Sequence, residues 1–434
     1  MAAPDARSLE YMDPGERSQI QLERLQATLN RANKMVPFYR ERFLGSKAQP
    51  SQVDTLEDLR RVPFTERRHL SENYPYGLFS VPLRDIVRIH TAPGASVVPS
   101  VSGYTVNDLT LWRQMVARAL SAAGMTANDI LQIHLDEGLA NWGRDYKDGA
   151  ERIEAGVIPL TALPLEKQLM VLKDYKTSFL VTSASGALHL VDTLFQTGLH
   201  PSELALKTLI LVGEPVSADM RASIEKKLDL GTWVHYGLSE VPGPALAFEC
   251  EAHDGLHVSE DHFYPEIVDP ATGQLVPNGE SGELVLTTLT TRAFPLIRFR
   301  TGDRMRFLSN KCPCGRTLRR VQWLPDRTDD TVIIRGVKVH QEQIFQHIER
   351  ILGFAPRECR LMAGRRGSSM GLQVWLGVDD ELFSDEIKEL EQLVESVTNG
   401  LRHDLGVPVK VRLKEKAESN FRPAKWITDP EEYR

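Results

Sequence analysis

The sequence has little cysteine, no long hydrophobic run and no excess of basic charge. Four cysteines among 434 residues are too few for a disulfide-stapled scaffold. No apolar run approaches the roughly 20 residues of a membrane-spanning helix, and residues 1–7 lack the apolar core of a signal peptide. We therefore expect a cytoplasmic protein with no membrane partner. Lys and Arg number 52 against 59 Asp and Glu, so we expect no nucleic-acid partner.

Several common catalytic signatures are also missing. The sequence has no Gly-x-Ser-x-Gly nucleophile elbow, no Rossmann glycine fingerprint and no Walker A lysine. These absences argue against the enzyme classes built on those motifs. Hydrophobic residues make up 41% of the chain, which is enough to bury a large core, and the length predicts two or three domains.

The first part of the chain carries the pattern of an α/β protein. Mostly helical spacing of apolar residues predicts an amphipathic helix over 16–35, ending before Pro37. A second helix is expected within 101–123, after a turn at Ser102-Gly103. Short apolar runs then alternate with helical patterns, which favours a largely parallel sheet. The expected strands are 129–134, 156–160, 179–182, 208–212 and 233–236, and the helices between them are 166–174, 186–196 and 217–228.

The pattern changes after about residue 245. Strands are expected at 283–289 and 304–308, and the turn signals around them indicate a more antiparallel region. A polar stretch at 325–331 predicts a boundary, followed by a small α+β domain of roughly 100 residues. Its expected elements are strand 332–335, helix 341–352, strand 372–376, helix 385–402 and strand 409–413.

Several stretches, in order along nearly the whole chain, resemble the phenylacetate–CoA ligase family of adenylate-forming enzymes. They are 36–40 (Val-Pro-Phe-Tyr-Arg), 236–240 (Tyr-Gly-Leu-Ser-Glu), 260–266 (Glu-Asp-His-Phe-Tyr-Pro-Glu), 282–285 (Gly-Glu-Leu-Val), 298–303 (Arg-Phe-Arg-Thr-Gly-Asp), 312–317 (Cys-Pro-Cys-Gly-Arg-Thr), and 327–330 (Arg-Thr-Asp-Asp) with 333–336 (Ile-Ile-Arg-Gly). One stretch alone would be a weak signal, whereas the ordered set points to a shared fold and ancestry.

The resemblance implies the α/β adenylate-forming fold, with a large N-terminal domain over 1–327 and a small, mobile α+β C-terminal domain over 328–434. In that family a carboxylate attacks the α-phosphate of ATP, an acyl-adenylate forms and pyrophosphate leaves. The thiol of CoA then attacks the adenylate. The implied ligands are therefore a small aryl or acyl acid, ATP, Mg²⁺ and CoA, and a homodimer is a candidate assembly.

The resemblance also assigns roles to individual residues. Glu240 would help to hold Mg²⁺, Ser239 would contact phosphate and Tyr236 would pack against adenine. Asp303 would accept hydrogen bonds from the ribose, and Arg327 would support the same sugar. The further cofactor-binding positions are Ser96 in the phosphate loop, Glu214 in the strip beside the adenine pocket, Gly237 and the hinge residue Asp329. Taken singly, Asp303 also fits a turn carboxylate and Tyr236 a core aromatic.

Three segments depart from the family pattern. The family's phosphate loop reads Ser-Ser-Gly-Thr-Thr-Gly-Lys-Pro-Thr, whereas residues 92–100 read Ala-Pro-Gly-Ala-Ser-Val-Val-Pro-Ser. Valine disfavours a positive φ and supplies no charge. A C-terminal Gly-Lys pair is missing, which leaves Arg422 or Lys425 as the catalytic cation. Residues 136–143 carry charges and Trp142 in place of a glycine-rich stretch, which suggests a remodelled acid pocket.

Cysteine and histidine gather in the region 250–314. Cys312-Pro313-Cys314 places two thiols one residue apart, and thiolate and imidazole groups suit tetrahedral Zn²⁺. The resemblance matches His257 to a histidine of the family. We therefore expect a structural Zn²⁺ held by Cys250, His257, Cys312 and Cys314. Buried, reduced thiols are the alternative for these cysteines.

Three functions remain open from the sequence. The main hypothesis is ATP-dependent activation of a carboxylic acid and transfer to CoA, weakened by the altered loop. The alternative is a catalytically inactive family member that binds an acyl ligand or a partner protein. A minor alternative is adenylyl or acyl transfer to an acceptor other than CoA. The loop at 91–100 is the feature on which the choice depends.

Overall fold

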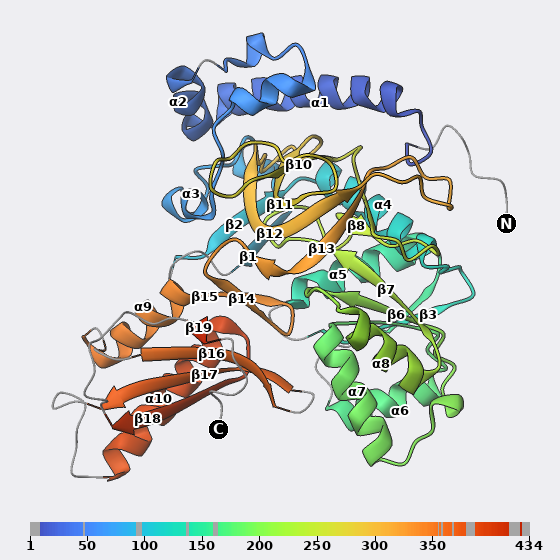
Figure 1. Ribbon diagram of the computed structural model, residues 1–434, viewed down its shortest axis with the longest axis vertical. Coiled ribbons are helices and arrows are strands. Elements are labelled where there is room, and N and C mark those ends of the chain that lie inside the picture. Colours follow the sequence, from blue (N-terminus) through green and yellow to red (C-terminus); the bar gives the residue numbers. More distant parts are fainter. Residues whose placement is uncertain are drawn as a thin grey trace.

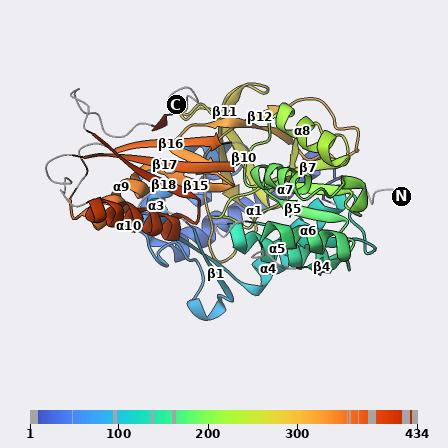
Figure 2. The same cartoon turned by 90° about the horizontal axis from the view of Figure 1, so that it is seen from below.

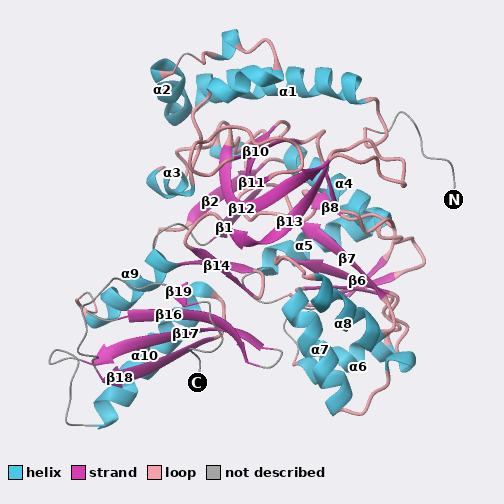
Figure 3. Ribbon diagram, in the orientation of Figure 1, coloured by secondary structure: helices cyan, strands magenta, loops and turns pink. Residues whose placement is uncertain are grey.

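A computed structural model of the chain describes residues 9–46, 48–92, 98–135, 139–158, 164–354, 356, 359–366, 369–378, 387–415 and 426–427. It confirms the predicted mixed α/β class, and Figure 3 shows helices and strands interleaved along the molecule. No helix in the described part of the chain is both long and apolar enough to cross a membrane.

The N-terminal helix α1 (Pro14–Met35) lies across one end of the molecule (Figure 1). Its start is set by Asp13, whose carboxylate caps the first turn, and by Pro14. Leu25 and Leu29 are buried against the core, as the helical spacing predicted. The helix ends before Pro37, and the chain continues into α2 (Pro37–Gly45) and α3 (Arg67–Glu72).

A large sheet of 11 strands forms the centre of the described chain, in the order β10-β11-β12-β13-β9-β8-β7-β6-β5-β3-β4. One half of it is parallel, as predicted, because buried strands of this kind alternate with helices along the sequence. These strands are β3 (Ile130–Ile133), β4 (Gly156–Ile158), β5 (Phe179–Thr182), β6 (Thr208–Val212) and β7 (Gly231–Tyr236).

Helices cover both faces of the parallel half (Figure 1, Figure 2). Those of one face, α4 and α5, pack against each other, and those of the other face also contact one another. The bounds are α4 (Val106–Ala122), α5 (Ala140–Arg152), α6 (Leu165–Asp174), α7 (Ala184–Gln196) and α8 (Ala218–Leu228). Three of them match the predicted helices closely, whereas α5 was not predicted.

The segment 101–123 differs in part from its prediction. Residues Ser100–Tyr104 form strand β2, which pairs with β1 (Arg88–Ala92), and the helix begins only at Val106. Thr105 and Asp108 form a capping box that sets this start. The predicted turn at Ser102-Gly103 is therefore part of a strand.

The other half of the large sheet is mostly antiparallel, as predicted from its turn signals. Its strands are β8 (Ala247–Phe248), β9 (Leu256–Val258), β10 (Phe263–Val268), β11 (Ser281–Thr288), β12 (Phe299–Leu308) and β13 (Arg320–Arg327). Because β12 and β13 pair directly, Asp303 of β12 and Arg327 of β13 lie side by side.

The described residues after β13 form two smaller sheets. A hairpin of β14 (Thr331–Ile334) and β15 (Val337–His340) comes first. A four-stranded sheet in the order β18-β17-β16-β19 follows, packed with α9 and α10. The bounds are α9 (Gln341–Leu352), β16 (Cys359–Arg366), β17 (Ser369–Val378), α10 (Ile387–Leu405), β18 (Val409–Glu415) and β19 (Trp426–Ile427). Strands β16 and β19 were not predicted.

Candidate active site

The fully buried carboxylate of Asp303 lies where several elements meet. Asp303 is on β12, and it is paired in register with Arg327 of β13. The hydroxyl of Tyr236, at the end of β7, donates a hydrogen bond of 2.7 Å to Oδ2 of Asp303. Lys338 Nζ, from β15, lies 2.7 Å from the same oxygen, and the guanidinium of Arg327 pairs with Oδ1.

These cations control the charge of the carboxylate. Burial alone would raise the pKa of Asp303, but Lys338 and Arg327 outweigh it and hold the pKa below its usual value. Burial lowers the pKa of Lys338 to about 8, although Asp303 opposes that shift. The pair is therefore a buried ion pair to which a tyrosine hydroxyl adds a hydrogen bond.

Arg327 links Asp303 to Asp329. Its Nε and Nη2 each donate a hydrogen bond of 2.8 Å to a different oxygen of Asp329, so the contact is bidentate. Burial would raise the pKa of Asp329, and Arg327 holds it well below its usual range. Arg327 thus joins the predicted residues Asp303 and Asp329, at the junction between the large sheet and the β14–β15 hairpin.

The loop after β7 supplies Gly237, Ser239 and Glu240 to a narrow pocket of about 30 Å³. Glu240 is buried and forms an ion pair with Arg67, the first residue of α3. Within the described residues, Nη2 of Arg67 is buried without a hydrogen-bond partner, whereas Oε1 of Glu240 is the oxygen that pairs with Nη1 of Arg67. The free Nη2 suits an anion as its ligand, and the buried carboxylate of Glu240 offers oxygen atoms of the kind that Mg²⁺ prefers.

The rest of this pocket is apolar. Its polar rim also includes Lys338, which pairs with Asp303. The pocket is therefore adjacent to the Asp303 cluster, which consists of Asp303, Tyr236, Arg327 and Lys338. The apolar lining comes from both sides of the hairpin contact: Ala92, Leu139, Trp142, Leu238, Trp323 and Val337. The site therefore combines charged groups with an apolar wall, which suits a ligand with a polar head and an apolar body.

Gly213 and Gly336 let the hairpin approach this pocket. Both have positive φ angles, +83° and +82°. A Cβ added at Gly213 would lie 2.8 Å from the Cα of Gly336, and one at Gly336 would lie 2.5 Å from Cδ1 of Leu139. Only glycine fits this close contact between β6 and the β14–β15 turn.

Glu214 follows Gly213, and its side chain contacts the start of α7 rather than lying free in the pocket. One of its oxygens accepts a hydrogen bond of 2.9 Å from the hydroxyl of Ser185. This contact joins the end of β6 to the first turn of α7. The predicted strip beside the adenine pocket is therefore held rigidly by its neighbours.

Sequence reasoning missed Arg67 and Lys338. Lys338 follows the matched motif 333–336 by two residues, so the alternation of strand β15 was the available signal. Arg67 carried no such signal, because its partner Glu240 lies 173 positions away in the chain. Three predicted residues, Ser96, Arg422 and Lys425, lie outside the described residues.

The predicted Cys/His set comes together in space. The four ligand atoms of Cys250, His257, Cys312 and Cys314 lie within 4.8 Å of one another. The sulfur atoms of Cys250 and Cys312 are 3.5 Å apart, and Cys314 Sγ is 3.4 Å from Nε2 of His257. Tetrahedral Zn²⁺ with bonds of about 2.0–2.3 Å requires similar separations. The residues therefore fit the metal.

This cluster borders the N-terminal segment. Arg316, two residues after Cys314, pairs with Glu10 at 2.7 Å. The backbone N–H of Thr317 donates to the carbonyl of Glu10 at 2.9 Å, and Arg17 binds the carbonyl of Thr317 at 2.7 Å. The cysteine loop thus attaches the start of α1 to the large sheet. Cys359 is far along the chain and buried in the core, and burial raises the pKa of its thiol to about 12.

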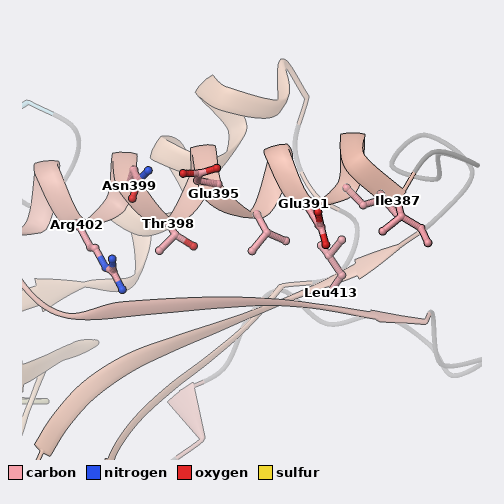
Figure 4. Close-up of a pocket in the computed structure, with 9 residues that line it drawn as sticks. Ile387, Glu391, Glu395, Thr398, Asn399, Arg402 and Leu413 are labelled. Carbon is pink, nitrogen blue, oxygen red and sulfur yellow. The ribbon is translucent and has the colours of Figure 1, made fainter.

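A wider groove of about 510 Å³ lies elsewhere, between α10 and β18 (Figure 4). Its walls are formed by apolar residues such as Leu413 and by polar ones such as Glu391, Glu395 and Arg402. None of the predicted site residues lines it. Its larger volume therefore does not make it the candidate active site.

No family model matches the chain. Among curated proteins, it is 40% identical over 347 residues to a phenylacetate-coenzyme A ligase of Pseudomonas putida, covering 78% of each chain. It is 36% identical over 413 residues to the enzyme of the same name from Aromatoleum evansii, covering 95% of this chain and 93% of the relative.

Among solved structures, the chain resembles a 2-hydroxyisobutyryl-CoA ligase. The structure of that ligase with 2-HIB-AMP and CoA in the thioesterification state gives a TM-score of 0.87 at 25% identity, covering 98% of this chain and 94% of the other. Its postadenylation state with 2-HIB-AMP gives 0.70 at 26% identity, covering 99% and 94%. These matches confirm the adenylate-forming fold, and the curated relatives show that the chain belongs to the phenylacetate–CoA ligase family.

Proposed function

We propose that this protein activates a carboxylic acid with ATP and transfers the acyl group to CoA. The observation that carries the proposal is the buried Asp303 cluster beside a pocket lined by Ser239 and Glu240, in a chain of this family. The curated relatives bear the name phenylacetate-coenzyme A ligase, which favours an aryl acid as the substrate.

The reaction has two balanced steps. A carboxylate oxygen of the acid attacks the α-phosphorus of ATP, the bond to the β-phosphate oxygen breaks, and pyrophosphate leaves. The thiol sulfur of CoA then attacks the acyl carbon of the adenylate and loses its proton, and AMP leaves. The protein contributes by binding, orienting and neutralising charge, because these effects account for most catalysis of phosphoryl and acyl transfer.

The nucleoside part of ATP is assigned to the Asp303 cluster. Asp303 would accept hydrogen bonds from the ribose hydroxyls, and Arg327 would hold that carboxylate in place. The ring of Tyr236 would lie against adenine, with Gly213 and Glu214 along the same pocket. Burial of Asp303 supports this role, since a desolvated carboxylate accepts strong hydrogen bonds.

The phosphate part is assigned to the loop after β7. Ser239 and the backbone at Gly237 would contact phosphate, and the unpaired Nη2 of Arg67 offers a further donor. Glu240 fits Mg²⁺ because it is a buried carboxylate oxygen donor. When bound, Mg²⁺ would neutralise phosphate charge. Ser96 and the cations Arg422 and Lys425 remain candidates for the same region.

The apolar wall of the pocket is assigned to the acid. Leu139, Trp142 and Leu238 form a surface that suits an aromatic or aliphatic body. The carboxylate of the acid would then face Glu240, Arg67 and the phosphates.

We further propose that residues 1–327 and 328–434 are separate domains and that the second moves between the steps. Two observations support the boundary. In chain order, the last strand of the large sheet ends at Arg327, and the hairpin that follows forms a separate sheet. The higher TM-score with a thioesterification-state structure supports an arrangement suited to the CoA step. The Cys/His set would hold a structural Zn²⁺, because four protein ligands leave no open position.

The test is a separated assay with MgATP and phenylacetate. Without CoA, we expect acid-dependent exchange of labelled pyrophosphate into ATP; with CoA, we expect AMP and a thioester in equal amounts. Asp303→Asn should lose both activities. If the wild-type chain binds no MgATP at millimolar concentration and forms neither product, the catalytically inactive alternative is favoured and the proposal fails.

A further inference from the structure

Lys338 pairs with the carboxylate to which the ribose has been assigned. Its Nζ lies 2.7 Å from Oδ2 of Asp303, with 16% of the lysine side chain exposed. The other partner of Oδ2 is the Tyr236 hydroxyl, and Oδ1 pairs with Arg327. Both oxygens of a fully buried carboxylate are therefore in use. Because no part of the Asp303 side chain is exposed, a ribose hydroxyl could reach this carboxylate only after one of these donors has moved away.

Lys338 is the donor that can leave at the lowest cost. Tyr236 and Arg327 are on β7 and β13, and both strands belong to the large sheet. Lys338 is on β15, which within the described part of the chain pairs with β14 alone, in a separate two-stranded sheet. Withdrawal of that hairpin, or a rotation of the lysine side chain, would free Oδ2 without breaking the large sheet.

The position of the β14–β15 hairpin is set by packing contacts other than those of Lys338. Gly336 packs against Gly213 and Leu139 at distances that exclude a side chain, and Ile334 and Val337 are buried. These contacts bring Lys338 to Asp303. An ammonium group removed from water in this way needs an anionic partner, and Asp303 provides it when no nucleotide is present.

We infer that Lys338 and the ribose of an adenine nucleotide are alternative partners of Asp303, so that Lys338 closes the ribose site when it is empty and is displaced when a nucleotide binds. The inference rests on the proposed function, because it takes Asp303 as the ribose acceptor. Lys338 is thus a positioning residue: it competes with the nucleotide and favours the departure of AMP after the acyl transfer.

Adenosine is the probe that separates ribose binding from phosphate binding, because it carries no charge. We would measure its dissociation constant by calorimetry on the full chain, for the wild type and for Lys338→Met, Lys338→Arg and the exposed control Lys410→Met. Loss of one charge-assisted hydrogen bond predicts adenosine binding about tenfold tighter in Lys338→Met. Lys338→Arg and Lys410→Met should stay near the wild type. 2′,3′-Dideoxyadenosine, which has no ribose hydroxyls, should gain nothing from Lys338→Met.

Other results would overturn the inference. Unchanged or weaker adenosine binding in Lys338→Met, in a variant whose thermal unfolding matches the wild type, contradicts the competition. So does weaker AMP binding with unchanged adenosine binding, since Lys338 would then be a phosphate ligand. If Lys338→Met fails to fold, tight adenosine binding by Lys338→Arg also contradicts it. Binding of ATP by the wild type identifies these as failures of the inference alone; if no variant binds ATP, AMP or adenosine, the proposed function fails as well.

Discussion

Glu240 is the residue on which the phosphate half of the proposed site depends. It is buried, and Arg67 forms an ion pair with it. A carboxylate in this position can be stable only if a cation remains beside it. Arg67 and a bound Mg²⁺ would provide such a cation on either side.

We predict that Glu240→Gln removes the Mg²⁺ dependence of ATP binding. In the wild type, Mg²⁺ should tighten ATP binding at least about tenfold, because a carboxylate and the phosphates share the ion; in the variant this gain should vanish. Calorimetry with and without Mg²⁺ measures both. The exposed Glu280→Gln is the matched control, and a full Mg²⁺ effect in Glu240→Gln would remove Glu240 from the metal site.

His235 makes the core sensitive to acid. It is fully buried on β7, its Nδ1 lies 2.9 Å from the hydroxyl of Tyr146, and burial lowers its pKa to about 3. In the unfolded chain the imidazole has its ordinary pKa near 6.5. Between pH 6.5 and about 3 the unfolded state therefore binds the proton and the folded state does not, so stability is lost as the pH falls.

We predict that this histidine alone costs about 2 kcal/mol of folding free energy between pH 7 and pH 5. His235→Asn keeps an acceptor for Tyr146 but does not titrate, so the loss on acidification should shrink by that amount. Chemical denaturation at the two pH values gives the difference. The exposed His200→Asn should leave the pH dependence as it is; an equal slope for wild type and His235→Asn would contradict the prediction.

At the scale of elements, the Cys/His set connects three segments of the large sheet and its loops. It joins the loop after β8, strand β9 and the loop after β12, and the adjoining Arg316 and Thr317 hold the segment before α1. Loss of a metal here should therefore loosen the N-terminal helix as well as the cysteine loop.

We predict one Zn²⁺ per chain in the purified protein, and a fall of at least about 5 °C in the unfolding midpoint when a strong chelator removes it. Cys312→Ser should contain little metal and be cleaved faster by protease near residues 9–17. Cys359→Ser, which changes a core thiol outside the cluster, should keep its metal. Less than about half an equivalent of Zn²⁺ in protein never exposed to chelator would count against the site.

At the scale of the whole molecule, the β14–β15 hairpin is where the two proposed domains meet the site. Gly336 enters the gap beside Gly213, which places the turn of the hairpin next to the pocket. If the C-terminal part moves between the steps, this contact exists only in the arrangement seen here. A substitution at Gly336 should then affect one half-reaction and not the other.

We predict that Gly336→Ala slows thioester formation at least about tenfold but changes pyrophosphate exchange less than about threefold. The added methyl group would lie 2.5 Å from Leu139, so the hairpin cannot seat. Gly353→Ala is the control, since Gly353 has a similar φ of +79° but no atom within 4 Å of an added Cβ. Equal losses in both half-reactions, measured separately, would argue against two arrangements.

Local sequence patterns determined most of the elements correctly. Buried strands such as β5 and β6, and helices such as α1, were predicted because a period of two or 3.6 residues is a property of neighbours in the chain. The helix α5 was missed because its sequence is polar and glycine-bearing, and its helical form depends on packing against α4. Strand β16 was missed because its pairing with β17 is a tertiary contact.

The sequence by itself determined the family and named Tyr236, Asp303 and Arg327 as well as the Cys/His set, because ordered motifs preserve residue identity. Only the tertiary structure decided which groups meet there. The ion pair of Arg67 with Glu240, the close contact of Gly213 with Gly336 and the pairing of Lys338 with Asp303 each join distant parts of the chain. Such contacts have no local period to reveal them, since they arise only when a sheet and a hairpin pack together.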